Sequence, residues 1–339
     1  MNRISRRRFV QSTGLLAAAP ALISMPASAQ RPQRTAPDTS DLRPEKDIVF
    51  GKGGDMDLTL DVYHPPEGVT PKRMGIIHLF GGGFFVGNKN AGYIINDARA
   101  LGRLGYTSIS ANYRLQSQGF WPAQIHDTKA AIRWTRANAE HIGIDADKIA
   151  IAGYSAGGML ALLAAGTNGM KEFEGDGGNA GVSSDVQACI GVYPLASAES
   201  AKGLWPQGEA TPEKIKAASP TTYISKTFAP TIFIHGTDDH TVPTTSSIDF
   251  YTKLHDLGVP AALTLIQGAE HAFDNGALDA VDVMAKAVDL FLDRLIVNPK
   301  PYPHFGGGGG RPGGRGPGGR GPTGGAPGAG ARGPGGGGQ

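Results

Sequence analysis

The sequence predicts a doubly wound α/β fold built on a mostly parallel sheet. Two observations carry this prediction. Between Asp47 and Pro299, short apolar runs alternate with longer helix-forming segments, an order typical of a parallel sheet covered on both faces by helices. In addition, the apolar run 148–152 leads into a G-x-S-x-G pentapeptide, 153–157, and then into a helix former. A serine on such a strand-to-helix turn is typical of a nucleophile elbow.

The individual elements are predicted from the spacing of apolar residues. Residues 47–50 and 56–63 are expected to form an antiparallel edge, because residues 56–62 alternate with period two. Further strands are expected at 75–80, 107–111, 148–152, 186–193, 231–235 and 262–266. Helices are expected between and after them, at 90–104, 123–141, 156–165, 245–257 and 277–296.

The amino-terminal end differs in composition from the middle of the chain. Residues 1–29 combine a basic start with adjacent arginines, a mildly apolar stretch and the small-residue pattern Ala27-Ser28-Ala29. These features indicate a twin-arginine signal peptide, transient contact with the twin-arginine export machinery, and a periplasmic or secreted product. A retained membrane anchor is the competing interpretation, but the stretch contains Pro20 and is shorter than the ~20 apolar residues of a spanning helix. Residues 30–46 are interpreted as a linker to a folded domain at 47–299.

The carboxy-terminal end, 300–339, is predicted to be a disordered tail. From Phe305 onward it consists almost entirely of Gly, Pro, Ala and Arg, which bury too little apolar surface to offset the entropy of ordering. Its arginines have no aromatic residues among them to stack on bases, and the formal net charge of the chain is only +2. No nucleic-acid partner is therefore expected.

The composition also limits the kinds of site. Cys189 is the only cysteine and lies in an apolar run, so it is interpreted as a small core residue, and stability has to come from the core without disulfides. No Cys/His cluster has zinc spacing and there is no H-E-x-x-H motif. Neither a metal nor a cofactor is predicted.

A serine nucleophile requires a base, and the base requires an acid that orients it. In this architecture the acid and then the histidine follow the serine, each on a loop just past a strand. His271 alone directly follows a late strand and precedes the final helix, so it is the predicted base, with His235 and His240 as weaker candidates. Asp238 and Asp239 are the candidate acids, and chain position alone does not separate them.

Acyl transfer also requires backbone donors for the oxyanion, one of which comes from the residue after the nucleophile, Ala156. The loop after the 75–80 strand has three consecutive glycines, 81–83, which allow the main chain to approach a substrate closely. A phosphate-binding loop is the rival interpretation. It fails because the Lys and the Ser or Thr of that motif are not at the required positions.

Taken together, these motifs resemble the α/β-hydrolase family, and they are most similar to its hormone-sensitive-lipase-like and carbohydrate-esterase-like branch. The resemblance covers most of residues 47–296 in the expected order. It rests on the glycine loop, Tyr113-Arg114-Leu115, the run 127–145 that includes Trp134, Gly153-Tyr154-Ser155-Ala156-Gly157-Gly158, His235-Gly236-Thr237-Asp238-Asp239 with Val242-Pro243, and Gly268-Ala269-Glu270-His271.

The resemblance implies specific roles at the site. The family pattern H-G-x-x-D-x-x-V-P assigns the acid to Asp239, and the family's oxyanion donors correspond to Gly82, Gly83 and Ala156. The chain departs from the family at Phe80, where a histidine usually precedes the three glycines. The donors are backbone groups and survive this change, whereas the bracing supplied by that histidine does not.

The implied activity is hydrolysis of short-chain carboxylic esters through an acyl-enzyme on Ser155, with acylated sugars or polysaccharides as candidate substrates. Two alternatives stay open: an exported serine peptidase of the prolyl type, and a non-catalytic binding protein that keeps the fold. Residues 196–219 are interpreted either as a small cap or as an ordinary surface connection. Four aromatic residues either line a pocket or belong to the core: Phe84, Phe85, Trp121 and Trp205.

Overall fold

The computed structural model describes residues 41–301. The chain divides into two units between Pro299 and Lys300, and the fold described below is that of the first unit. The predicted signal peptide, most of the predicted linker and nearly all of the predicted tail lie outside the described residues.

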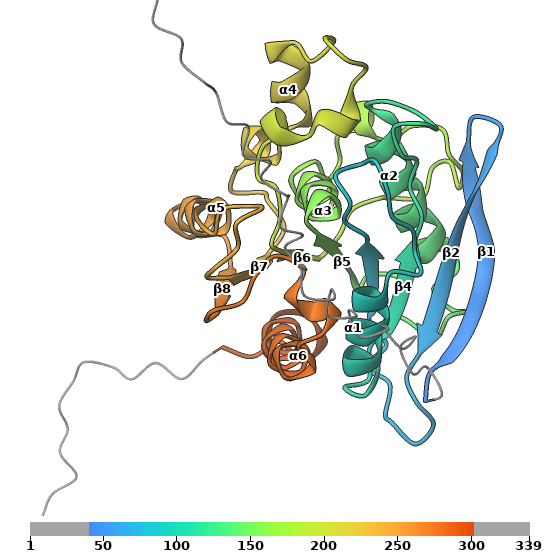
Figure 1. The fold of residues 1–339 in the computed structure, drawn as a ribbon. Coiled ribbons are helices and arrows are strands. Elements are labelled where there is room, and N and C mark those ends of the chain that lie inside the picture. Colours follow the sequence, from blue (N-terminus) through green and yellow to red (C-terminus); the bar gives the residue numbers. More distant parts are fainter. Residues whose placement is uncertain (1–40, 302–339) are drawn as a thin grey trace, which may run out of the picture. The chain divides into compact units, whose positions relative to one another are not determined.

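An eight-stranded sheet forms the centre of this unit (Figure 1), with the order β1-β2-β4-β3-β5-β6-β7-β8. β2 is antiparallel to both of its neighbours, β1 and β4. The strands β3, β4, β5, β6, β7 and β8 are parallel to one another. The predicted doubly wound, mostly parallel sheet is confirmed. The strands are β1 Arg43–Gly53, β2 Met56–His64, β3 Gly75–Leu79, β4 Thr107–Ala111, β5 Ile149–Tyr154, β6 Ala188–Val192, β7 Thr231–Gly236 and β8 Ala261–Ile266.

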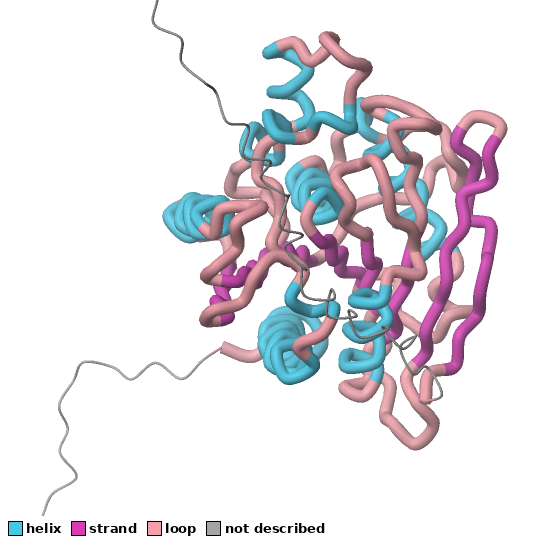
Figure 2. Tube along the Cα trace, viewed as in Figure 1, coloured by secondary structure: helices cyan, strands magenta, loops and turns pink. Residues whose placement is uncertain are grey.

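Helices cover both faces of the sheet (Figure 1), and Figure 2 shows them alternating with strands along the trace. α1 and α6 lie together on one face, and α2, α3 and α5 lie on the other. The helices are α1 Gly92–Gly102, α2 Ala123–Ala137, α3 Ala156–Gly166, α4 Pro212–Ala218, α5 Thr245–Asp256 and α6 Leu278–Leu292. No helix in the described part of the chain is both long and apolar enough to span a membrane.

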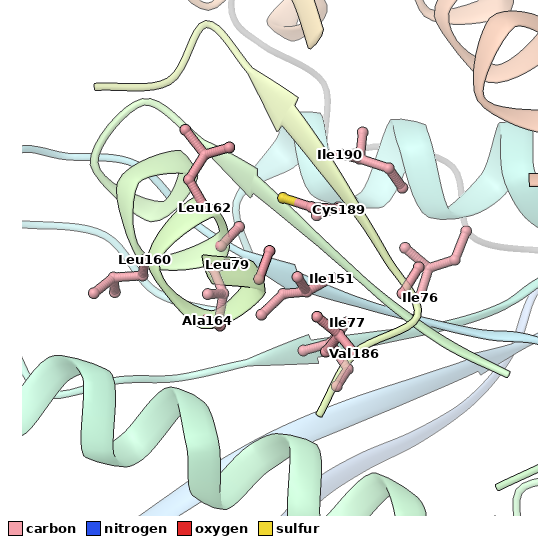
Figure 3. Packing of buried hydrophobic residues seen from close by; sticks show 14 of the residues in the cluster. Ile76, Ile77, Leu79, Ile151, Leu160, Leu162, Ala164, Val186, Cys189 and Ile190 are labelled. Carbon is pink, nitrogen blue, oxygen red and sulfur yellow. The ribbon is translucent and has the colours of Figure 1, made fainter. Parts of the chain in front are cut away.

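The hydrophobic core fills both faces of the sheet, and Figure 3 shows the part of it between α3 and the central strands. Every residue of β3, β5, β6 and α3 is buried, which explains why these segments read as continuous apolar runs. Burial of each large aliphatic side chain contributes roughly 1.5–3 kcal/mol. Cys189 lies in this core, where burial raises the pKa of its thiol. Its predicted role as a core residue agrees with this position.

The structure corrects the predicted start of the domain. β1 begins at Arg43, and residues 43–45, which were assigned to the linker, pair with residues 62–64 of β2. Pro44 and the charged residues around it conceal the strand in the sequence. A proline is tolerated there because β1 is an edge strand, where a missing N–H donor leaves no neighbour unpaired.

The parallel strands determine where the site forms. β5, β7 and β8 run in the same direction, so their carboxyl ends meet at one edge of the sheet. Ser155 follows β5, the loop with Asp239 follows β7, and the loop with His271 follows β8. Three residues that are far apart in the sequence are therefore brought to the same edge.

Candidate active site

Ser155 occupies a strained turn between β5 and α3. Its backbone has φ 53° and ψ −115°, a conformation that L-residues with a side chain rarely adopt. The flanking glycines make this turn possible. A Cβ atom at Gly153 would lie 2.2 Å from the carbonyl oxygen of Gly157, and one at Gly157 would lie 2.2 Å from that of Leu79. Any other residue at these positions would push the strand and the helix apart.

The structure brings Ser155, His271 and Asp239 into one hydrogen-bonded line. The Nε2 atom of His271 lies 3.0 Å from Oγ of Ser155, and its Nδ1 atom lies 2.7 Å from Oδ2 of Asp239. Since the carboxylate can only accept, Nδ1–H donates to Asp239 and Nε2 is left to accept from the serine hydroxyl. This tautomer suits a general base.

Asp239 is held as a carboxylate by its surroundings. Its second oxygen, Oδ1, accepts hydrogen bonds from the N–H groups of Thr241 and Val242, both at 2.8 Å. Burial raises the pKa of this carboxyl, but hydrogen bonds from His271 and from the two backbone groups outweigh burial and lower it overall. The neighbouring Asp238 is exposed and accepts a hydrogen bond from the Thr237 hydroxyl.

His235 is a residue of the site that sequence reasoning considered only as a weaker base. It is fully buried at the end of β7, and its Nε2 atom lies 3.0 Å from the carbonyl oxygen of Val242 and 3.2 Å from Oδ2 of Asp239. Its Nδ1 atom lies 2.8 Å from Oγ of Ser247. Burial lowers its pKa, so the ring is neutral, and its Nε2–H donates to the Val242 carbonyl beside the acid. The signal for this role is the spacing of four residues between His235 and Asp239.

The glycine loop lies beside the nucleophile. A Cβ atom at Gly81 would lie 3.1 Å from Cβ of Ser155. Gly82 and Gly83 have φ values of +119° and +64°, which glycine adopts readily. Within residues 41–301, no hydrogen bond uses the N–H groups of Gly82, Gly83 or Ala156, and Ala156 is the first residue of α3. These three donors are free to bind an anion.

Aromatic contacts brace the loop at the position where the family has its histidine. The ring of Phe80 stacks on that of Tyr113, with centroids 4.2 Å apart and planes within 8°. The Tyr113 hydroxyl donates to the carbonyl oxygen of Phe80 at 2.7 Å, and the N–H of Gly81 donates to the hydroxyl of Tyr93 at 2.8 Å. The bracing lost with the histidine is supplied here by two tyrosines.

The segment 196–219 packs against this loop. It contains two short 3-10 turns, Ala198–Ser200 and Lys202–Leu204, followed by α4. A Cβ atom at Gly203 would lie 2.4 Å from the carbonyl oxygen of Gly83, so the two backbones are in direct contact. An open cavity of about 330 Å³ lies against the segment and is also lined by Phe85 and Gln116.

The four aromatic candidates divide between core and cavity. Phe84 is fully buried in the core, whereas Phe85 is 49% exposed and lines the cavity together with Trp205. The ring of Trp121 lies next to that of Trp205, with centroids 6.2 Å apart. Within the described residues, no group of three or more His, Cys, Asp or Glu side chains is arranged to hold a metal ion.

Comparison with known proteins points in the same direction as this geometry. The family model described as BD-FAE matches residues 60–254. Among curated proteins of Mycobacterium tuberculosis, Esterase LipQ is 32% identical over 80% of this chain and 66% of its own length, and Esterase LipC is 28% identical over 78% and 70%. The chain therefore spans about two thirds of the length of these relatives.

Solved structures show the same similarity over nearly the whole length of the matched chains. A truncated carbohydrate esterase from gut microbiota superimposes with a TM-score of 0.63 at 25% identity, covering 76% of this chain and 99% of that one. Thermogutta terrifontis esterase 2, phosphorylated by paraoxon, superimposes with a TM-score of 0.65 at 27% identity, covering 78% and 98%.

Proposed function

Because this chain belongs to the BD-FAE family and to the α/β-hydrolase esterases, we propose that it hydrolyses carboxylic esters through an acyl-enzyme on Ser155. The observation that carries the proposal is the line of hydrogen bonds from the Ser155 hydroxyl through His271 to Asp239. A serine hydroxyl is a weak nucleophile without such a base, and an orienting carboxylate stabilises the imidazolium that forms.

In the first half of the reaction, Nε2 of His271 takes the proton of Ser155 while Oγ attacks the ester carbonyl carbon. The carbonyl oxygen becomes an oxyanion, which the N–H groups of Gly82, Gly83 and Ala156 bind. The amino-terminal end of α3 adds the favourable end of its dipole. The C–O bond to the alcohol then breaks, and the imidazolium gives its proton to the leaving oxygen.

The second half repeats these steps with water. His271 takes a proton from a water molecule, whose oxygen attacks the acyl carbon and forms a second tetrahedral intermediate at the same donors. When this intermediate collapses, Oγ of Ser155 leaves and recovers its proton from His271, and the carboxylic acid is released. Asp239 stays ionised throughout, because its hydrogen bonds hold its pKa low.

We propose short acyl esters of sugars or polysaccharides as the substrate class. The cavity beside the oxyanion loop combines an exposed ring, Phe85, with polar side chains such as Gln116 and Lys202. A sugar ring has an apolar C–H face that packs on an aromatic ring and hydroxyls that need polar partners. One of the structural relatives is described as a carbohydrate esterase.

We also propose that the enzyme acts outside the cytoplasm. The support is the composition of residues 1–29, with its adjacent arginines and small-residue cleavage pattern. Sequencing the amino terminus of the protein recovered from the periplasm tests this proposal. A start near Gln30 is expected, and an intact Met1 in the cytoplasmic fraction would contradict it.

A substrate panel with two serine variants tests the proposed activity. The panel contains p-nitrophenyl esters of graded acyl length, acetylated and feruloylated sugars, and a prolyl anilide as the amide arm. The native protein and Ser117→Ala, an exposed serine, are expected to hydrolyse short esters and acylated sugars, whereas Ser155→Ala does not. Cleavage of the anilide alone would favour a peptidase, and no reaction with any ester would favour a binding protein.

A further inference from the structure

Tyr193 links the base to the interior of the protein. It directly follows β6, its φ is 38°, and its side chain is buried. Its ring lies against that of His271, with centroids 4.6 Å apart. Its hydroxyl donates to the carboxyl group of Asp274, at 2.8 Å from Oδ1 and 2.9 Å from Oδ2. The tyrosine therefore contacts the base with its ring and the loop of the base with its hydroxyl.

Asp274 lies on the same loop as His271, close after it in the chain. Its side chain is completely buried, and its carbonyl oxygen accepts a hydrogen bond from Nδ2 of Asn96 on α1 at 3.2 Å. Between the two residues, Ala272 has a left-handed φ of 57°, which a non-glycine residue adopts only when its surroundings require it. The buried carboxyl group thus anchors the loop just after this strained residue.

A second pair of the same kind supports the nucleophile. Tyr154 immediately precedes Ser155, and its hydroxyl donates to Oδ2 of Asp97, a buried residue of α1. The ring centroids of Tyr154 and Tyr193 lie 6.2 Å apart. The other oxygen of the Asp97 carboxyl, Oδ1, is buried and has no hydrogen-bond partner within the described residues.

Two buried carboxyl groups this close together are costly for stability. Burial raises the pKa of Asp97 well above its ordinary value, with a further rise from the nearby Asp274. Burial also raises the pKa of Asp274 to about 7. Proteins in which buried charged groups are replaced by apolar residues of similar volume are often as stable as the original or more stable. Stability of the fold alone therefore does not account for these carboxyls.

We propose that the pairs Tyr193–Asp274 and Tyr154–Asp97 form one buried positioning unit, in which Asp274 holds His271 at reacting distance from Ser155. This inference rests on the proposed function. Asp274 touches neither substrate nor reacting atoms, so it acts through the histidine. Acylation and deacylation both use His271, so loosening its loop slows both steps and leaves substrate binding nearly unchanged.

The experiment compares Asp274→Ala, Asp274→Asn and Tyr193→Phe with Asp282→Asn, an exposed carboxylate on α6. The kcat and KM for p-nitrophenyl acetate and the rate of inactivation by a serine-reactive phosphonate are measured well below the Tm of each variant. Asp274→Ala and Tyr193→Phe are expected to lower kcat about tenfold or more with KM within about twofold. Asp274→Asn, which still accepts from Tyr193, is expected to stay within about threefold of the native kcat, and Asp282→Asn to match it.

Other outcomes overturn the inference. If Tyr193→Phe keeps kcat within about twofold, or if Asn at position 274 is no better than Ala, the two pairs are only structural. If Asp274→Ala does not fold, Tyr193→Phe decides, because it removes one hydroxyl and keeps the ring against His271. If the native protein reacts with neither the ester nor the phosphonate, the proposed function itself is wrong. If native protein and variants are equally active, only the positioning role is wrong.

Discussion

His235 contacts the same oxygen of Asp239 that pairs with His271. Its Nε2 atom lies 3.2 Å from Oδ2, and the Nδ1 atom of His271 lies 2.7 Å from it. Asp239 therefore contacts the buried, neutral ring of His235 as well as the catalytic base His271. The first prediction follows from this arrangement.

Replacing His235 with Phe is expected to lower kcat about tenfold, which corresponds to about 1.4 kcal/mol of transition-state stabilisation. An aromatic ring is kept, but Asp239 loses the N–H group beside it, and the Val242 carbonyl and the Ser247 hydroxyl lose their hydrogen-bond partner. Steady-state kinetics on a p-nitrophenyl ester measures the change. His240→Gln is the control, because His240 is exposed and pairs with Glu270. Equal kcat in the two variants would show that His235 has no effect on the acid.

Replacing Asp239 with Asn is expected to lower kcat by about 10⁴, because the wrong tautomer of His271 is then favoured. The pKa of Asp239 is lowered below its ordinary value of 3.8. Its contribution to stability is therefore complete above that value and is lost as the pH falls through the folded-state pKa.

Urea unfolding of native protein and Asp239→Asn at pH 7 and at pH 3 measures this linkage. The difference in unfolding free energy between them should shrink at the lower pH. Asp238→Asn serves as the control, because that carboxylate is exposed. A difference that stays constant across the range would mean that Asp239 is not held ionised by its hydrogen bonds.

Gly82→Ala is expected to reduce kcat by about 10²–10³, the usual effect of losing one oxyanion donor. A Cβ atom there would lie 2.0 Å from the carbonyl oxygen of Val86, at a φ of +119°, so the loop must move. Gly143→Ala is a matched control, since Gly143 also has a positive φ but no atom within 4 Å of its Cβ position. Far-UV circular dichroism confirms that both variants are folded. A normal kcat in Gly82→Ala would show that this loop does not bind the oxyanion.

The buried carboxyl of Asp274 is expected to make stability fall as the pH rises. In the folded protein burial raises its pKa to about 7 from an ordinary 3.8, so the folded state keeps a proton that the unfolded state has lost. The free energy of unfolding of the native protein, relative to Asp274→Asn, should therefore decrease between about pH 4 and pH 7. Thermal unfolding across this range measures it. A rise, or no change, would mean that the carboxyl is ionised in the fold.

Phe85→Ala is expected to weaken the use of acylated sugars selectively. The half-exposed ring lines the cavity beside the oxyanion loop, so its loss should lower kcat/KM about tenfold for an acetylated sugar and less than about twofold for p-nitrophenyl acetate. Phe120→Ala is the control, because Phe120 is also exposed but does not line the cavity. An equal loss on both substrates would argue against a sugar-binding role.

Elements that depend on local residue patterns could be predicted from the sequence. Buried parallel strands and the elbow around Ser155 are encoded within a few residues, so their positions were predictable. The start of β1 at Arg43 was not, because Pro44 masks it and only pairing with β2 reveals it. Adjacent carboxylates such as Asp238 and Asp239 differ only in how their loop folds, so a family pattern was needed to choose between them.

The interior network was beyond sequence reasoning for a different reason. Asp97 and Asp274 lie on helix α1 and on the loop after β8, and each reads in the sequence as an ordinary surface carboxylate. Only the tertiary fold buries them beside Tyr154 and Tyr193. Long-range burial of a polar group leaves no periodicity in a single sequence.

The most direct test of the account is the site of covalent reaction with a serine-reactive phosphonate. Native protein, treated to complete inactivation and mapped by peptide mass spectrometry, should carry one adduct, on Ser155, and Ser155→Ala should carry none and hydrolyse no ester. Ester hydrolysis that persists in Ser155→Ala, or inactivation with the adduct on another residue, would show that Ser155 is not the nucleophile.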